Sequence, residues 1–132
     1  MVILADSSAW VGYLRGTGSP AAGKVRELAG TGELASTEVI AMEVLAGARD
    51  AQHLGMIRSL LSWNESLPIS PLEDYESAAA IYRTCRAAGV TPRQMNDCVI
   101  AAIAIRNDVA LLRDDRDFES LARYTPLRTI MA

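Results

Sequence analysis

Several carboxylates stand beside apolar segments, where a folded chain would bury them, and these are the candidates for chemistry. Asp6 follows a short apolar run, Glu43 lies within an apolar stretch, and Asp97 comes just before an alanine-rich segment. Segment 114–117, with the sequence DDRD, follows a further apolar run. Unpaired carboxylates are rarely buried, and neighbouring ones repel each other unless a cation is bound between them. The residues therefore predict a site at which carboxylate oxygens bind a hard cation.

Each of these acids also has a purely structural explanation. Asp6 and Asp97 could act as helix caps. Glu43 falls on the same helical stripe as Ile40 and Gly47, so it points the way the apolar residues point. A glutamate in that position needs a partner, which could be an arginine in a buried salt bridge instead of an ion.

The acidic segment 114–117 leaves open which of its carboxylates would bind the ion. In an extended chain Asp115 and Asp117 share one side, and Asp114 faces the other. The structural alternative is a solvated loop in which Asp117 caps the next helix.

The hydrophobic pattern predicts the elements that position these acids. Residues 99–105 are apolar on every side, which predicts a helix buried all round. Asp97 stands at its start, where a carboxylate suits the positive end of the helix dipole. Residues 109–112 predict a central strand of a parallel sheet. Further strands are predicted at 2–5, 34–35, 66–69 and 127–130, and further helices at 7–15, 20–29, 37–48, 50–63, 72–88 and 119–124. Strands that alternate with helices predict an α/β fold, whose chemistry lies beyond the carboxyl ends of its strands.

Composition narrows the class of protein. The chain has 132 residues, which suits one domain, 1–132, with a single core. It has no apolar run long enough for a membrane span and no secretory signal at its start, and Cys85 and Cys98 form no metal motif. We therefore expect a cytoplasmic protein. The net charge of −3 argues against unaided binding along a nucleic-acid backbone, although bound divalent ions would reverse the local potential.

Four motifs, in this order, resemble the PIN domain family. They are DSSAW after the first predicted strand, EVLAGAR in the third helix, NDCVIAA at the start of the buried helix, and DRDFE from Asp115 onward. The resemblance spans essentially the whole chain and is similar in particular to the VapC-type toxins of bacterial toxin–antitoxin pairs. It implies a PIN-like three-layer α/β/α fold with a short central parallel sheet.

The resemblance also implies roles for individual residues. The acidic quartet is Asp6, Glu43, Asp97 and Asp115, with Asp117 as a nearby contributor. Asp114 stands where relatives often carry a basic or neutral residue. The hydroxyl of Ser8 matches a position that lines the family's site, and three arginines flank the motifs and could contact RNA phosphates: Arg93, Arg113 and Arg116.

As a member of this family the chain would be an endoribonuclease dependent on Mg²⁺ or Mn²⁺, in which the ions polarise the phosphate and activate a water. It would form a homodimer and be silenced by a VapB-like antitoxin. No histidine is required, and His53 is expected to lie outside the site.

Other interpretations of the function of these acids have less support in the sequence. A phospho-receiver domain would need adjacent acids after the first strand and a late lysine, but the chain has Asp6-Ser7 and a single lysine, Lys24. An aspartyl phosphatase usually has a second acid two residues after the first, where this chain has Ser8. Glycines 16, 18 and 23 follow a helix and not a strand, so they do not form a dinucleotide loop. The remaining alternative is a PIN-like module without activity that binds RNA or a protein partner.

Overall fold

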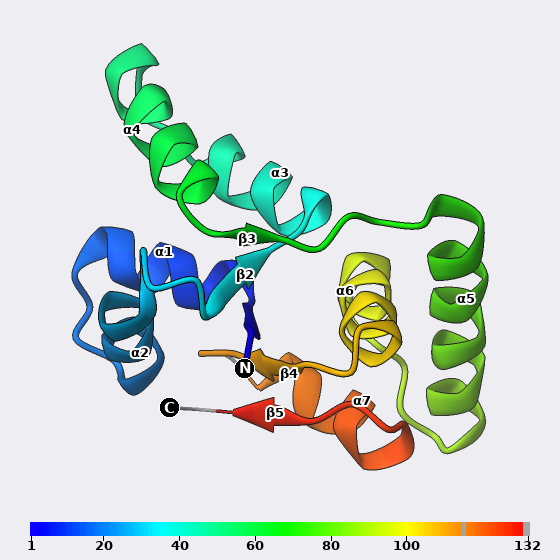
Figure 1. The fold of residues 1–132 in the computed structure, drawn as a ribbon. Helices are drawn as coiled ribbons and strands as arrows, with labels where there is room; N and C mark the ends of the chain where they lie inside the picture. The colour runs from blue at the N-terminus through cyan, green and yellow to red at the C-terminus, as the bar shows by residue number, and fades with distance from the viewer. Residues whose placement is uncertain (115, 131–132) are drawn as a thin grey trace.

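A five-stranded parallel sheet lies at the centre of the computed structural model, which describes residues 1–114 and 116–130 (Figure 1). The strands follow the order β3-β2-β1-β4-β5, and every neighbouring pair is parallel. Their bounds are β1 Ile3–Ala5, β2 Leu34–Ser36, β3 Glu65–Ser66, β4 Ala110–Leu112 and β5 Thr129–Ile130. The predicted α/β class with a short parallel sheet is therefore confirmed.

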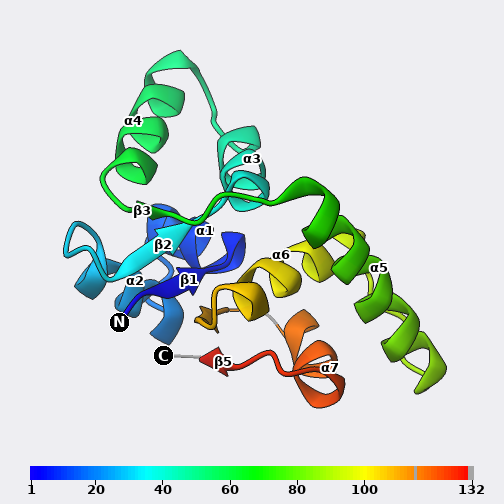
Figure 2. The same ribbon diagram turned by 45° about the vertical axis from the view of Figure 1, so that its right-hand side comes forward.

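Helices cover the sheet and make up most of the chain. Their bounds are α1 Ser7–Arg15, α2 Pro20–Leu28, α3 Glu38–Ala46, α4 Ala51–Ser62, α5 Pro71–Ala87, α6 Met95–Arg106 and α7 Asp117–Tyr124. α1 and α2 pack together on one side of the sheet, and α5, α6 and α7 pack together on the other (Figures 1 and 2). α3 packs against α4 and also touches both α1 and α6. In the described part of the chain no helix is both long and apolar enough to cross a membrane.

The strand register brings the ends of β1 and β4 side by side. Leu4 pairs with Leu111, Ala5 pairs with Leu112, and all four side chains are fully buried. The Asp6 N–H continues the ladder by donating to the carbonyl of Leu112 at 2.8 Å. The chain passes outward through β2 and β3 and then returns to the other side of β1. Such a reversal point, at the carboxyl ends of the strands, is where open α/β sheets bind ligands.

The structure moves several predicted boundaries: β5, for example, begins at Thr129 and not at 127. The edge strand was expected at 66–69, but β3 is Glu65–Ser66, because Glu65 pairs with Ala35. Both β3 residues are exposed, so no apolar alternation marks the strand in the sequence. The last helix begins at Asp117 instead of 119, and its first turn therefore includes part of the acidic segment.

Both cysteines are free thiols buried completely in the core. Burial raises the pKa of Cys85, and burial together with Cys85 and Asp97 raises the pKa of Cys98 to about 11. Because the thiolate is the reactive form, we expect both thiols to resist Ellman's reagent at pH 8 in the folded protein and to react promptly in denaturant. Rapid labelling of the native protein would contradict this.

Candidate metal-binding active site

Asp6 is fixed at the junction between β1 and α1. It is 3% exposed and is the N-cap of α1, where its Oδ2 accepts hydrogen bonds from the Ser8 N–H at 3.2 Å and the Ser8 hydroxyl at 2.8 Å. Asp6 therefore does act as a helix cap, but this role does not exclude metal binding. An ionised carboxylate offers about four lone-pair positions, and both Ser8 bonds use one oxygen.

Asp97 and Glu43 lie on the two helices that meet near this edge of the sheet. Asp97 is 8% exposed and lies in the first turn of the otherwise buried α6, as predicted. Glu43 lies on α3, which packs against both α1 and α6. Its Oε1 is buried and has no hydrogen-bond partner among the described residues, and the expected alternative of a salt bridge is not seen within that part of the chain. A buried carboxylate oxygen without a donor is costly unless a cation or water binds it.

This oxygen-rich set fits a hard divalent ion, but the ligand set is incomplete without the acidic segment. Within residues 1–114 and 116–130, no three acidic, histidine or cysteine side chains are close enough to hold a metal ion. Asp115, the predicted fourth ligand, lies outside the described residues. Mg²⁺ retains several waters in most protein sites, so carboxylates can also bind it through water. A site at Asp6, Glu43 and Asp97 therefore needs Asp115, bridging waters or both.

Asp114, which follows β4 closely, connects this end of the sheet to α1 and α2. Its N–H donates to the Ser8 hydroxyl at 3.0 Å, and its Oδ2 accepts from the Ser19 hydroxyl at 2.7 Å. Ser19 is the N-cap of α2 and also accepts from the Ala22 N–H at 3.1 Å. Ser8 thus bridges the Asp6 carboxylate and the backbone of the acidic segment, whereas the Asp114 carboxylate binds a hydroxyl. Nothing in the sequence alone indicated that Ser19 would support this segment.

Gly12 makes room for the Asp114 carboxylate. A Cβ added at Gly12 would lie 3.0 Å from Asp114 Oδ2 and 3.3 Å from Thr17 Oγ1. Moving Asp114 away would break its hydrogen bond with Ser19, which costs about 1 kcal/mol.

Alanine normally stabilises a helix by roughly 1 kcal/mol relative to glycine. We expect Gly12→Ala to lack this stabilisation, because the added methyl group meets Asp114, and to destabilise the protein by up to about 1 kcal/mol. Gly55→Ala is the matched control, because Gly55 is exposed within α4 and an added Cβ there meets nothing within 4 Å. That control should be about 0.5–1 kcal/mol more stable than the parent. Urea denaturation of both variants checks this, and equal stabilisation by the two changes would mean that Asp114 moves freely.

The predicted phosphate-binding arginines have different environments. Arg93 is largely exposed and its Nη1 lies 3.4 Å from Asp117 Oδ1, whereas Arg116 is exposed at the start of α7. Arg113 is only 4% exposed, and its Nη2 pairs with Glu119 Oε1 at 3.2 Å. This burial points to a role for Arg113 in holding the acidic segment against α7 and argues against direct contact with a phosphate.

A buried ion pair elsewhere was missed by the sequence analysis. Asp74, in the first turn of α5, is 1% exposed. Its two carboxylate oxygens accept from Arg106 Nε at 2.8 Å and Nη2 at 2.9 Å, and Oδ2 also accepts from the Ser70 N–H at 2.7 Å. The pair joins α5 to the end of α6, which is the opposite end from Asp97. It therefore belongs to the scaffold and not to the carboxylate site.

Comparisons with known proteins agree with this architecture. The PIN domain model matches residues 3–124. The VapC ribonuclease Mb1587 of Mycobacterium bovis and ribonuclease VapC11 of Mycobacterium tuberculosis are each 44% identical over 129 residues, covering 96% of both chains. The crystal structure of VapBC2 from Rickettsia felis bound to a promoter DNA fragment superposes with a TM-score of 0.79 at 17% identity, covering 98% of each chain. M. tuberculosis VapC20, a sarcin–ricin loop cleaving toxin, gives 0.67 at 13% identity over 96% of this chain and 98% of its own.

The two similar structures show the fold, whereas the family match and the 44% identical relatives show the family. The resemblance to the PIN domain family that the sequence indicated is thus confirmed. The chain belongs to the PIN domain family and, within it, to the VapC-type ribonucleases.

Proposed function

We propose that this protein is a toxin endoribonuclease that hydrolyses RNA phosphodiesters with Mg²⁺ or Mn²⁺ held by Asp6, Glu43, Asp97 and Asp115. The observation that supports the site most directly is the buried Glu43 Oε1, which has no hydrogen-bond donor among the described residues. Such an oxygen is expected where a ligand completes the site. The 44% identical ribonucleases support the reaction.

The residues of the chain have separable tasks in this proposal. When bound, the ion polarises the phosphate and lowers the pKa of a bound water. Asp6 presents one carboxylate oxygen in a direction fixed by the two Ser8 hydrogen bonds. Asp97 is held by the first turn of a helix that is buried along most of its length, which limits its movement. Asp117, at the start of α7, is a candidate for a more distant contact with the ion, since one of its oxygens already pairs with Arg93.

Arg93 and Arg116 are the better candidates for orienting RNA phosphates, because both side chains are exposed beside the acidic segment. His53 stays outside this chemistry. It lies on α4, and its Nδ1 accepts a hydrogen bond from the Arg49 N–H at 3.1 Å.

The function is tested by incubating the purified protein with total RNA in the presence of Mg²⁺, Mn²⁺ or excess chelator and mapping the new RNA ends. We expect discrete cleavage with either metal and none with the chelator. Cleavage that persists in the chelator would contradict the role of the carboxylates. Tight RNA binding without cleavage under all metal conditions would favour a binding module instead.

The proposed partners are a VapB-like antitoxin and a second copy of this chain. The structures of similar fold include VapBC complexes, which supports the first. For the second, Leu72 and Tyr75 lie one turn apart on α5 and are 79% and 56% exposed, as is common at a contact surface. Light scattering of the purified chain, alone and with its antitoxin, would establish both stoichiometries.

A further inference from the structure

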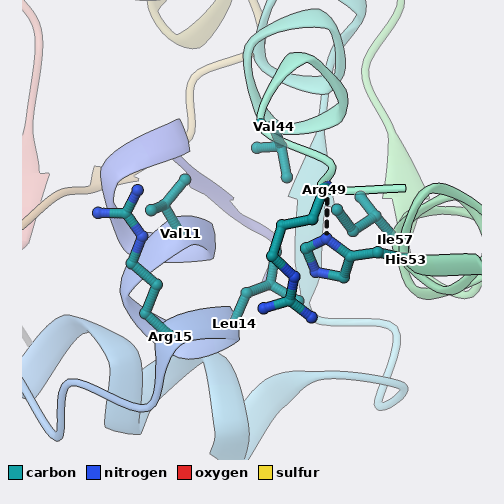
Figure 3. A pocket seen from close by; sticks show the side chains of 8 residues that line it. Val11, Leu14, Arg15, Val44, Arg49, His53 and Ile57 are labelled. Atoms are coloured by element: carbon teal, nitrogen blue, oxygen red, sulfur yellow. Dashed lines mark hydrogen bonds between the residues drawn. The ribbon is translucent and has the colours of Figure 1, made fainter. Parts of the chain in front are cut away.

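A cationic pocket lies between α1 and the α3–α4 pair (Figure 3). Its volume is about 350 Å³, and we call it the arginine pocket. Arg15 rises from α1 on one side, and Arg49 and His53 stand on the other (Figure 3). The lining residues are Val11, Leu14, Arg15, Val44, Gly47, Arg49, His53 and Ile57.

Two arginines of the pocket are exposed and have no acidic partner in the described part of the chain. Neither Arg15 nor Arg49 makes a side-chain hydrogen bond or ion pair with any residue in 1–114 or 116–130. His53 Nδ1 accepts from the Arg49 N–H, so its proton is on Nε2, which is then a further donor. The neighbouring acid, Asp50, accepts the His53 N–H as the N-cap of α4. Two unpaired guanidiniums in one pocket favour an anion, and their fork geometry suits a phosphate.

The pocket continues the helix faces that carry the active-site residues. Ser8, Val11 and Arg15 are spaced three and four residues apart on α1, so they share one face. Glu43 and Gly47 are likewise four residues apart, at the end of α3. Arg15 is the ninth residue after Asp6, which places the backbone of Arg15 about 13 Å along the helix from the acid. A strand bound at the carboxylates could therefore present a different phosphate to the arginine pocket.

The floor of the pocket is aliphatic, made by Val11, Leu14, Val44 and Ile57. Recognition of a base edge needs matched donors and acceptors, whereas the polar side chains of this pocket, Arg15, Arg49 and His53, offer donors. The arginine pocket therefore suits the sugar–phosphate backbone and not the identity of a base.

We propose that the arginine pocket binds a backbone phosphate of the RNA substrate, separate from the phosphate that is cleaved. This inference rests on the proposed ribonuclease function and extends it by assigning Arg15 and Arg49 to substrate binding. Because the chain as a whole carries a charge of −3, such local unpaired cations are what would hold a second part of the strand.

The test measures RNA binding without cleavage, in full-length protein carrying Asp97→Asn. The probe is a short, fluorescently labelled single-stranded RNA of mixed sequence, titrated at several salt concentrations. Arg15→Gln and Arg49→Gln should each weaken binding about three- to tenfold and reduce the slope of log affinity against log salt by about 0.7. Arg15→Lys should retain most of the slope because it keeps the charge. Arg83→Gln is the matched control, since Arg83 is an exposed arginine on α5 and should change neither quantity.

Activity with an intact Asp97 separates this proposal from the ribonuclease assignment. Arg15→Gln and Arg49→Gln should raise KM while leaving kcat nearly unchanged, since they remove binding that is equal in ground and transition states. If the parent cleaves RNA but the variants match it in affinity, salt slope and KM, the pocket is not a phosphate site and the ribonuclease assignment stands. If they lose affinity only for the antitoxin, the pocket binds an acidic protein segment, and the RNA proposal is wrong. A parent that cleaves no RNA would instead refute the underlying function. Melting temperatures equal to the parent's show that the variants fold.

Discussion

Replacing Asp97 by asparagine is expected to abolish RNA cleavage, by about 100-fold or more, while the fold is retained. The substitution is nearly isosteric, so the packing of the first turn of α6 around this 8% exposed side chain is kept. It removes one negative charge from a site that needs several to bind a divalent ion. The lost interaction with the helix dipole is worth about 0.3–1 kcal/mol, and relief of repulsion among the acids offsets it.

Thermal melting with and without Mg²⁺ measures the ligand role separately from activity. The parent should gain stability as Mg²⁺ is added, because an ion that binds only the folded state shifts the equilibrium towards it. Asp97→Asn should gain much less, and its melting temperature without metal should stay close to the parent's. An equal gain in the two proteins would show that Asp97 does not bind the ion, and loss of activity would then need another cause.

Of the substitutions considered, Arg106→Met should cause the largest loss of stability, about 3 kcal/mol or roughly 10 °C in Tm. The change leaves the Asp74 carboxylate, 1% exposed, with the Ser70 N–H as its remaining donor among the described residues. It also removes the hydrogen bond from Arg106 Nη2 to the Pro68 carbonyl at 2.8 Å. A buried charge that has lost its counter-ion costs far more than an exposed pair contributes.

The control is Arg128→Met, which removes an exposed pair with Asp108 whose side chains are 53% and 95% exposed. That change should cost below about 1 kcal/mol. Urea denaturation compares the two variants, and equal losses would mean that the Arg106 pair is no more strongly coupled than a surface pair.

The cost of Arg106→Met should also depend on pH. Burial by itself raises the pKa of Asp74, but the Arg106 guanidinium and the Ser70 N–H outweigh it and hold the pKa below its usual value. A carboxyl group whose pKa is depressed by folding stabilises the protein above its unfolded pKa, and this contribution is lost as the pH falls through the folded pKa. The loss of stability caused by Arg106→Met should therefore be largest near neutral pH and should shrink as the pH falls towards the depressed pKa of Asp74 in the parent.

The sequence by itself determined the order of the elements and the positions of the principal acids. Apolar runs at β1, β4 and α6 are local patterns, and a carboxylate next to such a run must lie at the end of the element. Because the strands are parallel, the ends that follow β1 and β4 meet at one edge of the sheet. The sequence could therefore place Asp6 beside the acidic segment, and periodicity placed Asp97 at the start of α6. The quartet of metal ligands stays a prediction that rests on the family motifs.

Only the tertiary structure decided which polar side chains pair across elements, both beside those acids and in the scaffold. Ser19 and Asp114 are 95 residues apart in the chain, and Asp74 and Arg106 are 32 apart. Neither pair has a sequence signature, since their contact depends on the path of the chain and not on helical or strand periodicity. The same holds for the arginine pocket, where residues of α1, the α3–α4 connection and α4 meet only after folding. Local patterns specify which face of an element is buried, whereas partners across elements are set by how the buried faces pack.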